Sequence, residues 1–183
     1  MSYHKDDFPN IPVHAQYINK LIKKHKFTVG AELGVRRGGF CISLLRDNRE
    51  LKMYAVDLWA PHADIEEHHF HDFHKETFHC RAAYHGLQDR VGVMQALTTE
   101  AAHKFGDETL DFIFADATHT SEALRKDLEA WIPKVKKTGM ISGHDYEEEW
   151  GMIPLIDSLG DVHVDEKSCS WHIMKKDLNE EWK

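Results

Sequence analysis

The sequence predicts an α/β fold, built on a doubly wound and mostly parallel sheet of seven strands with a reversed last strand. Three observations predict it. Short apolar runs alternate with amphipathic stretches along the chain, which is the pattern of parallel strands joined by crossover helices. The apolar runs show no strict alternation, as expected of strands buried on both faces. Polar residues follow several of the runs, and ligands bind at strand ends in open α/β sheets.

Seven apolar runs predict the strands. The fourth is apolar at Leu110, Phe112, Ile113 and Phe114, with no polar face. Gly139 supports a fifth strand that begins only after this glycine. The predicted strands are residues 28–33, 51–57, 91–95, 110–116, 140–144, 161–164 and 170–174.

Amphipathic spacing predicts helices between these strands. Ile18, Leu21 and Ile22 share one face of a helix in an N-terminal helical segment, residues 1–27. Thr120 or Ser121 can cap the helix that precedes the fifth strand. The remaining helices are expected at residues 40–46, 63–86, 99–105, 121–132 and 153–159.

A histidine-rich segment, residues 60–88, is expected to be largely helical and to cover the active site. Seven of the 15 histidines lie between residues 62 and 85. His68, His71 and His74 recur at spacings of three, so one interpretation is a metal site. The interpretation favoured here is a solvated helix whose aromatic side chains pack inward. Those side chains are Phe70, Phe73 and Phe78.

The composition limits the class of protein. The chain has 183 residues, which fits a single domain over residues 1–183. Lys and Arg number 23 against 31 Asp and Glu, a net charge of −8. This balance argues against nucleic-acid or membrane-surface binding, which needs clustered basic residues. Three scattered cysteines, a polar start and no apolar run of about 20 residues lead us to expect a cytoplasmic protein.

Chemically useful side chains gather at the carboxyl ends of the predicted strands. Because these ends meet at one edge of a parallel sheet, we expect a single binding site there. The residues are Glu32, Gly34 and Gly38 after the first strand, Asp57 after the second, Asp116 and His119 after the fourth, and His144 and Asp145 after the fifth.

The residues after the first two strands predict the type of ligand. Gly34 and Gly38 lack a Cβ, which lets the chain turn sharply and a ligand lie against it. Glu32 would repel a pyrophosphate but suits a ligand with a positive amine. Asp57 follows 25 residues later and can accept both hydroxyls of a ribose. S-adenosylmethionine (SAM) meets these demands.

Three sequence strings carry a family resemblance. The string E-L-G-V-R-R-G-G-F from Glu32 resembles motif I of class I SAM-dependent methyltransferases, in the form of small metal-dependent O-methyltransferases. The strings F-A-D-A-T-H, ending at His119, and S-G-H-D-Y, ending at Tyr146, resemble the catechol-type and macrolide-sugar branch. The similarity covers about residues 29–146.

The resemblance implies SAM as cofactor and a small-molecule methyl acceptor, most simply a hydroxyl. It places the methionine part of SAM at the glycine turn, the ribose on Asp57 and the adenine beside Leu58. The residues assigned to the cofactor are Glu32, Gly34, Gly38, Asp57, Leu58, Ala96, Leu97, Thr98 and Asp116. No nucleic acid or membrane is expected as partner, and a homodimer is left open.

The resemblance also implies a divalent metal on Asp116 and Asp145, with His119 as the general base. Many relatives carry Asn or Asp directly after the second of these aspartates, where Tyr146 stands here. His144 could take that role, although its place before Asp145 predicts that it turns away. A ligand set with histidine favours Zn²⁺, Mn²⁺ or Fe²⁺ over Mg²⁺.

Two alternatives remain at the level of sequence. The first is a protein of the same fold that binds an adenosyl ligand or a metal without turnover. The second is a nicotinamide-dependent oxidoreductase, against which Glu32 argues. Arg36 and Arg37 either contact a carboxylate or phosphate or belong to a solvated loop. Trp59 and Trp150 either stack on a ligand or fill the core.

Overall fold

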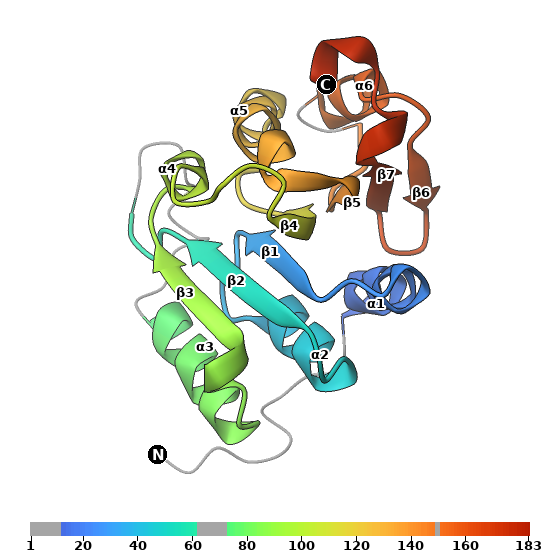
Figure 1. The fold of residues 1–183 in the computed structure, drawn as a ribbon. Coiled ribbons are helices and arrows are strands. Elements are labelled where there is room, and N and C mark those ends of the chain that lie inside the picture. The colour runs from blue at the N-terminus through green and yellow to red at the C-terminus, as the bar shows by residue number, and fades with distance from the viewer. Residues whose placement is uncertain (1–11, 62–72, 149–150) are drawn as a thin grey trace.

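The computed structural model describes residues 12–61, 73–148 and 151–183. A seven-stranded sheet in the order β3-β2-β1-β4-β5-β7-β6 forms its centre (Figure 1). β1 to β5 run parallel, and β7 runs antiparallel to both of its neighbours. The strands are β1 (Val29–Leu33), β2 (Lys52–Asp57), β3 (Val91–Gln95), β4 (Leu110–Ala115), β5 (Val135–Gly143), β6 (His163–Asp165) and β7 (Ser170–Met174).

The helices cover both faces of the sheet, so the fold class predicted from the sequence is confirmed. α1, α2 and α3 lie on one face and α4, α5 and α6 on the other (Figure 1). Among the described residues, no helix combines the length and the apolar character needed to span a membrane. The helices are α1 (Val13–His25), α2 (Gly39–Asp47), α3 (Phe73–Tyr84), α4 (Thr98–Ala102), α5 (Ser121–Trp131) and α6 (Met152–Ser158), with short 3₁₀ turns at Gln88–Arg90, Ile132–Lys134, Lys175–Asp177 and Glu180–Trp182.

Alternate residues of the central strands build the two cores. Ile113 of β4 packs under α4, α5 and α6 with the fully buried Trp131 and Trp171. Phe112 and Phe114, its neighbours on the same strand, face α1, α2 and α3. Because both faces are apolar, burial on each side stabilises the sheet by roughly 1.5–3 kcal/mol per large side chain.

The fifth strand begins earlier than the sequence predicted. β5 starts at Val135, which pairs with Leu110, and the register shifts between Leu110 and Phe112. Gly139 therefore lies inside β5 and not before it. A Cβ at this position would lie 2.5 Å from the backbone oxygen of Asp111, so the glycine permits close approach of two strands where it was expected to mark a break.

The inward face of α3 also differs from the prediction. His74, Phe78 and Ala82 are buried at successive helical turns, whereas Phe73 is 48% exposed. The spacing of four residues through Phe78 and Ala82 brings His74 inward and leaves Phe73 outside. Of the other predicted positions, His68, Phe70 and His71 lie outside the described residues.

Candidate active site

A cavity of about 640 Å³ opens at the carboxyl edge of the sheet, a volume suited to a small-molecule ligand. Loops after β1, β2, β3, β4 and β5 contribute to it. The cavity brings together every candidate site residue from the sequence except Gly38. Its lining includes Glu32, Gly34, Asp57, Leu58, Ala96, Leu97, Thr98, Asp116, His119, His144 and Asp145.

The glycine turn after β1 is shaped by protein contacts. Gly34 has φ +89°, and a Cβ there would lie 2.0 Å from the carbonyl oxygen of Asp116. Gly38 has φ +75° and precedes α2, and a Cβ there would lie 2.2 Å from the ring of Phe78. The sequence predicted a sharp turn with a ligand lying against it. The positive φ values agree with the turn, and the missing Cβ atoms make room for the loop after β4 and for α3. Contact of the glycine backbone with a ligand stays a prediction.

Asp57 ties the glycine turn to the end of β2. Its Oδ2 accepts hydrogen bonds from the backbone N–H groups of Val35, at 2.9 Å, and Arg36, at 2.7 Å. Its Oδ1 accepts the N–H of Trp59 at 2.7 Å. Since a carboxylate oxygen can accept two hydrogen bonds, Oδ1 retains capacity for one more donor. Asp57 therefore orders the turn and still lines the cavity.

Glu32 is a buried acid at the end of β1, 2% exposed. Its Oε2 accepts the backbone N–H of Cys41 at the start of α2, at 3.1 Å. Burial, reinforced by the charges of Asp116 and Asp57, holds the pKa of Glu32 well above its usual range. A cation in the cavity would favour the ionised form of this group.

The segment after β3 that lines the cavity is held in place by the buried carboxyl of Asp127. The hydroxyl of Thr98 donates to Asp127, and the indole N–H of Trp131 donates to the carbonyl of Thr98 at 3.0 Å. Burial raises the pKa of Asp127 to about 6 despite the hydrogen bond from Thr98. These contacts fix the segment that carries Ala96 and Leu97 against the cavity.

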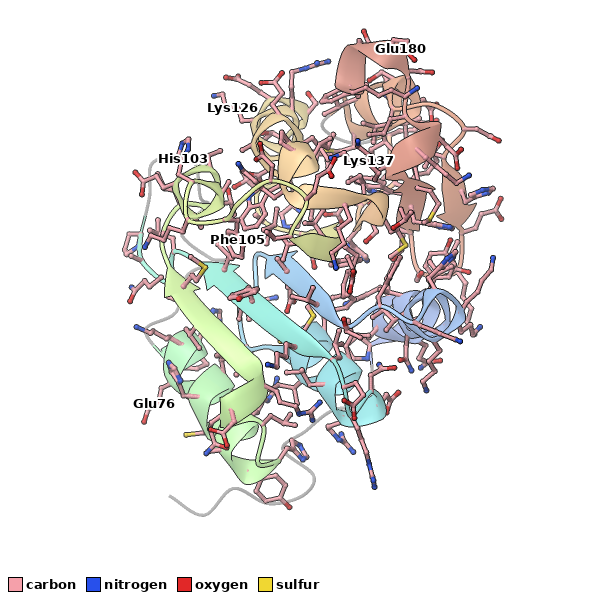
Figure 2. The ribbon with its side chains drawn as sticks, in the orientation of Figure 1. Glu76, His103, Phe105, Lys126, Lys137 and Glu180 are labelled. Atoms are coloured by element: carbon pink, nitrogen blue, oxygen red, sulfur yellow. The ribbon has the colours of Figure 1, made fainter. Side chains whose placement is uncertain are left out.

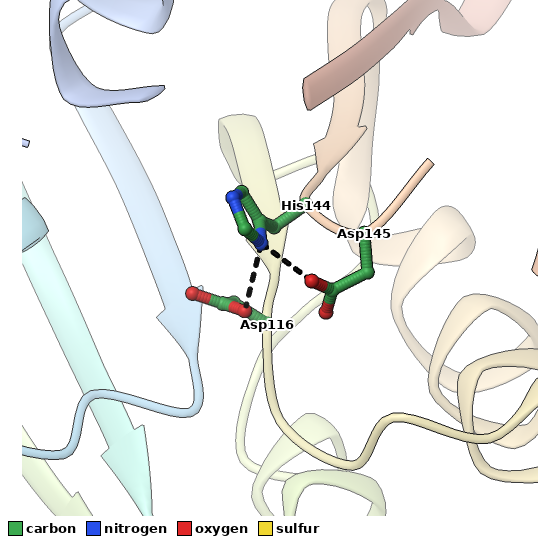
Figure 3. A group of neighbouring side chains, drawn as sticks. All are labelled: Asp116, His144 and Asp145. Carbon is green, nitrogen blue, oxygen red and sulfur yellow. Dashed lines mark hydrogen bonds and ion pairs between the residues drawn. The ribbon is translucent and has the colours of Figure 1, made fainter. Parts of the chain in front are cut away.

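The loops after β4 and β5 bring two aspartates and two histidines together. Figure 3 shows three of them: Asp116, His144 and Asp145. Asp145 Oδ2 lies 2.5 Å from His119 Nδ1, and Asp145 Oδ1 lies 2.6 Å from His144 Nδ1. His144 Nδ1 is 3.9 Å from Asp116 Oδ1. Asp145 has a left-handed backbone, φ +57°, so successive side chains turn to the same side. The expectation that His144 turns away is therefore wrong.

The pKa values of this cluster diverge. Burial, aided by the charge of Asp145, raises the pKa of Asp116 to about 7 against the opposing charges of His144, His119 and Arg36. The hydrogen bond that His119 donates to Asp145 raises the pKa of His119. Two histidine partners hold the pKa of Asp145 below its usual range although burial opposes them. Neighbouring groups with divergent pKa values are typical of functional sites.

Three of these side chains fit a metal ion. Ligand atoms of Asp116, His144 and Asp145 all lie within 4.8 Å of one another. Two carboxylates and one imidazole form a donor set that suits transition ions. Tyr146 stays out of the set, because its hydroxyl donates to Asp157 at 2.8 Å. His144 thus occupies the place that Asn or Asp was expected to fill.

His14 is the main cavity residue that the sequence reasoning missed. Its ring stacks on Phe40, at 5.5 Å between centroids, and on Phe114, at 5.8 Å, and meets His144 edge-on at 5.0 Å. Burial and the charge of His144 lower its pKa to about 4. The signal was present, since His14 precedes Ile18 by one helical turn on the apolar face of α1.

The structure describes residues 60, 61 and 73–88 of the histidine-rich segment, and Trp59 of the two tryptophans. Ala60, His74 and Arg81 of that segment line the cavity, and its covering role stays a prediction. Trp59 also lines it, stacks on Phe78 at 5.7 Å and donates its indole N–H to a backbone carbonyl, so it serves packing and lining together. Trp150 lies outside the described residues.

Strand order and site together define the class of the protein. A sheet with a reversed β7, an acid and a glycine turn after β1, and an acid after β2 form the class I SAM-dependent methyltransferase fold. A family model described as a methyltransferase domain matches residues 31–146. The chain therefore belongs to this methyltransferase family, which confirms the resemblance and speaks against the nicotinamide oxidoreductase.

Solved structures share the fold at low sequence identity. The SAH-bound methyltransferase PaMTH1 of Podospora anserina matches with a TM-score of 0.69 and 11% identity, over 96% of this chain and 83% of that one. A protein of Staphylococcus aureus provisionally described as a caffeoyl-CoA O-methyltransferase matches at 0.67 and 12%, over 91% and 85%. A SAM-dependent O-methyltransferase of Thermotoga maritima matches at 0.61 and 16%, over 91% and 54%.

One curated relative is similar in sequence. The protein y4gI of Sinorhizobium fredii, which is described as uncharacterized, is 24% identical over 136 residues. The match takes in 74% of this chain but 14% of y4gI. The chain therefore corresponds to a small part of that protein.

Proposed function

We propose that the chain binds SAM in the cavity and transfers its methyl group to a hydroxyl of a small molecule. One observation carries the proposal. The residues suited to an adenosyl amino acid and the pair His119 and Asp145 line the same cavity. A bound sulfonium and a group that can take a proton would therefore lie within one cavity.

The cofactor would be held at three points. Glu32 would pair with the ammonium of the methionine tail, and this charge would lower the raised pKa of the acid on binding. Asp57 Oδ1 would accept a ribose hydroxyl alongside the N–H of Trp59. Leu58 and Leu97 would flank the adenine from the loops after β2 and β3.

His119 would act as the general base. With Nδ1 donating to Asp145, the imidazole carries its lone pair on Nε2, and Asp145 fixes the ring orientation. Nε2 would take the hydroxyl proton, the oxygen would attack the methyl carbon, and the carbon–sulfur bond electrons would pass to sulfur. S-adenosylhomocysteine (SAH) would leave as a neutral thioether. Because the sulfonium is already activated, positioning supplies most of the remaining acceleration.

Asp116, His144 and Asp145 would hold a divalent ion if one is part of the enzyme. A bound ion supplies Lewis-acid chemistry that lowers the pKa of a coordinated hydroxyl. Asp145 could both orient His119 and bind the ion, because its Oδ2 lies beside His119 and its Oδ1 beside His144. The imidazole in the set suits Mn²⁺, Fe²⁺ or Zn²⁺ better than Mg²⁺.

The test is SAH formation from SAM with a panel of small hydroxyl compounds as acceptors. We expect turnover that falls about 10²–10⁴-fold in His119→Ala, the range for loss of a general base. The matched control is His103→Ala, since His103 is exposed at the end of α4 (Figure 2), and it should keep full activity. SAH binding without turnover on any acceptor would instead favour the non-catalytic alternative.

A chelator tests the metal separately. We expect treatment with EDTA or 1,10-phenanthroline to abolish most turnover and added Mn²⁺ to restore it, while SAH affinity changes little. Full activity after chelation would remove the metal from the proposal and leave the role of His119 intact.

A further inference from the structure

The backbone of Arg36 is held in a conformation that side-chain-bearing residues avoid. Its φ is +52°, in the left-handed region that is unfavourable for a residue other than glycine. Two contacts impose it. The N–H donates to Asp57 Oδ2 at 2.7 Å, and the carbonyl accepts the indole N–H of Trp59 at 2.8 Å. These two contacts fix the backbone from which the Arg36 side chain extends.

The side chain of Arg36 lines the cavity and is exposed to solvent. Within residues 12–61, 73–148 and 151–183, its guanidinium makes no hydrogen bond or ion pair. Arg36 and Asp116 line the same cavity.

Arg37 adds a second guanidinium to the same wall. It lines the cavity, and its guanidinium carbon lies 4.9 Å from the ring centroid of Phe73. Its Nε is shielded from solvent and has no hydrogen-bond partner in the described part of the chain. A shielded N–H without an acceptor is unfavourable unless a ligand supplies one. The whole chain carries a net charge of −8, so two adjacent cations at a cavity are a local feature.

We infer that Arg36 and Arg37 form a subsite for a carboxylate group of a molecule bound in the cavity. The planar guanidinium fork matches a carboxylate in a bidentate manner, and both pairs would be charge-assisted. The carboxylate has two sources: the methionine tail of the cofactor, or an acidic methyl acceptor. The inference rests on the proposed function for the identity of the cavity's occupant, and the subsite itself can be measured without it.

The first arm of the experiment removes the carboxylate from the ligand and, separately, the guanidinium from the protein. Isothermal titration compares SAH with decarboxylated SAH on the wild type, Arg36→Gln, Arg36→Lys and Arg37→Gln. Arg49→Gln, an exposed arginine outside the cavity, is the matched control. If the cofactor supplies the group, Arg36→Gln weakens SAH binding about 10–100-fold, as for a charged hydrogen bond. Decarboxylated SAH is then unaffected, and Arg36→Lys keeps part of the affinity.

The second arm tests the acceptor as source. Acetate is titrated by NMR into each protein, both free and saturated with SAH. If the acceptor supplies the group, the wild type binds acetate in the presence of SAH, both arginine variants lose this binding, and SAH affinity stays unchanged. Circular dichroism and thermal melts confirm that each variant is folded.

The outcomes separate the two claims. If the wild type binds acetate through Arg36 and Arg37 but binds no SAH, the proposed function is wrong and the carboxylate subsite is supported. Arginine variants that match the wild type for SAH, decarboxylated SAH and acetate would overturn the subsite and leave the proposed function standing.

Discussion

Two aspartates, one near the start of β4 and one just past its end, differ in how well their carboxylates are hydrogen-bonded. Asp111, near its start, accepts the N–H groups of Thr28 and Val29 at 2.7 and 2.9 Å and pairs with Lys136 at 2.7 Å. Asp116, just past its end, has His144 as its charged neighbour at 3.9 Å. The same side chain on one strand is thus fully satisfied at one edge of the sheet and poorly satisfied at the other.

The pKa values follow this difference. Burial would raise the pKa of Asp111, but the hydrogen bonds from Lys136, Thr28 and Val29 outweigh it and lower the pKa. Burial raises the pKa of Asp116 to about 7. Asp111 therefore stabilises the fold, whereas Asp116 costs stability when ionised. The aspartate at the amino edge of the sheet therefore stabilises the fold, whereas the aspartate at the carboxyl edge is left available to a ligand.

Asp116→Asn should give the largest effect on activity. We expect methyl transfer to fall by about 10²-fold or more, in the range of a lost electrostatic or acid–base group. SAH formation measures this loss, and Asp161→Asn, an exposed position, is the control. Unchanged turnover in Asp116→Asn would contradict a catalytic use of the carboxyl edge.

The stability of Asp116→Asn should rise at the same time. Because the folded pKa lies above the value of 3.8 for a free aspartate, ionisation destabilises the folded state as pH rises from about 4 toward 7. The asparagine removes this cost, so the melting temperature of the variant should gain on the wild type across that interval and level off above it. A constant difference from pH 4 to 8 would show that Asp116 does not titrate in this way.

Glu32→Gln should give the next largest effect, on affinity. We expect SAH binding to weaken about 10–100-fold, because the amide cannot pair as a charge with the ammonium. The melting temperature of the unliganded protein should rise, since the variant removes a buried acid with a raised pKa. Isothermal titration and thermal melts check both, and a variant that binds SAH as tightly as the wild type would remove Glu32 from the cofactor site.

Asp111→Asn should leave the chemistry intact and change only the fold. Loss of charged hydrogen bonds predicts a destabilisation of about 1–3 kcal/mol, or about 2–4 °C in melting temperature per kcal/mol. The lowered pKa means that this stabilisation is present above about pH 4 and is lost below it, so the two proteins should converge in acid. Asp107→Asn, an exposed loop residue paired with Lys134, is the control and should change the melting temperature little. Loss of turnover per folded Asp111→Asn molecule would break the contrast.

The strand ends were readable in the sequence because topology alone brings them together. Asp57, Asp116 and Asp145 each follow an apolar run, and any parallel sheet places such residues at one edge. The side chains that these aspartates contact could not be predicted from the sequence, because those contacts depend on the backbone conformation of the loops. The left-handed turn at Asp145 that brings His144 into the site has no glycine to mark it.

Packing explains the other differences. His14 enters the site through α1, which the sequence showed only as an amphipathic helix. His74 is buried and Phe73 exposed because tertiary contacts of Phe78 set the rotation of α3. Local hydrophobicity alone does not determine that rotation.

A crystal structure of the complex with SAH would show whether the cavity is the cofactor site. We expect SAH to fill the cavity, with its ammonium beside Glu32, a ribose hydroxyl on Asp57 and the adenine between Leu58 and Leu97. A complex in which SAH occupies another surface, or lies in the cavity with its ribose away from Asp57, would contradict this expectation.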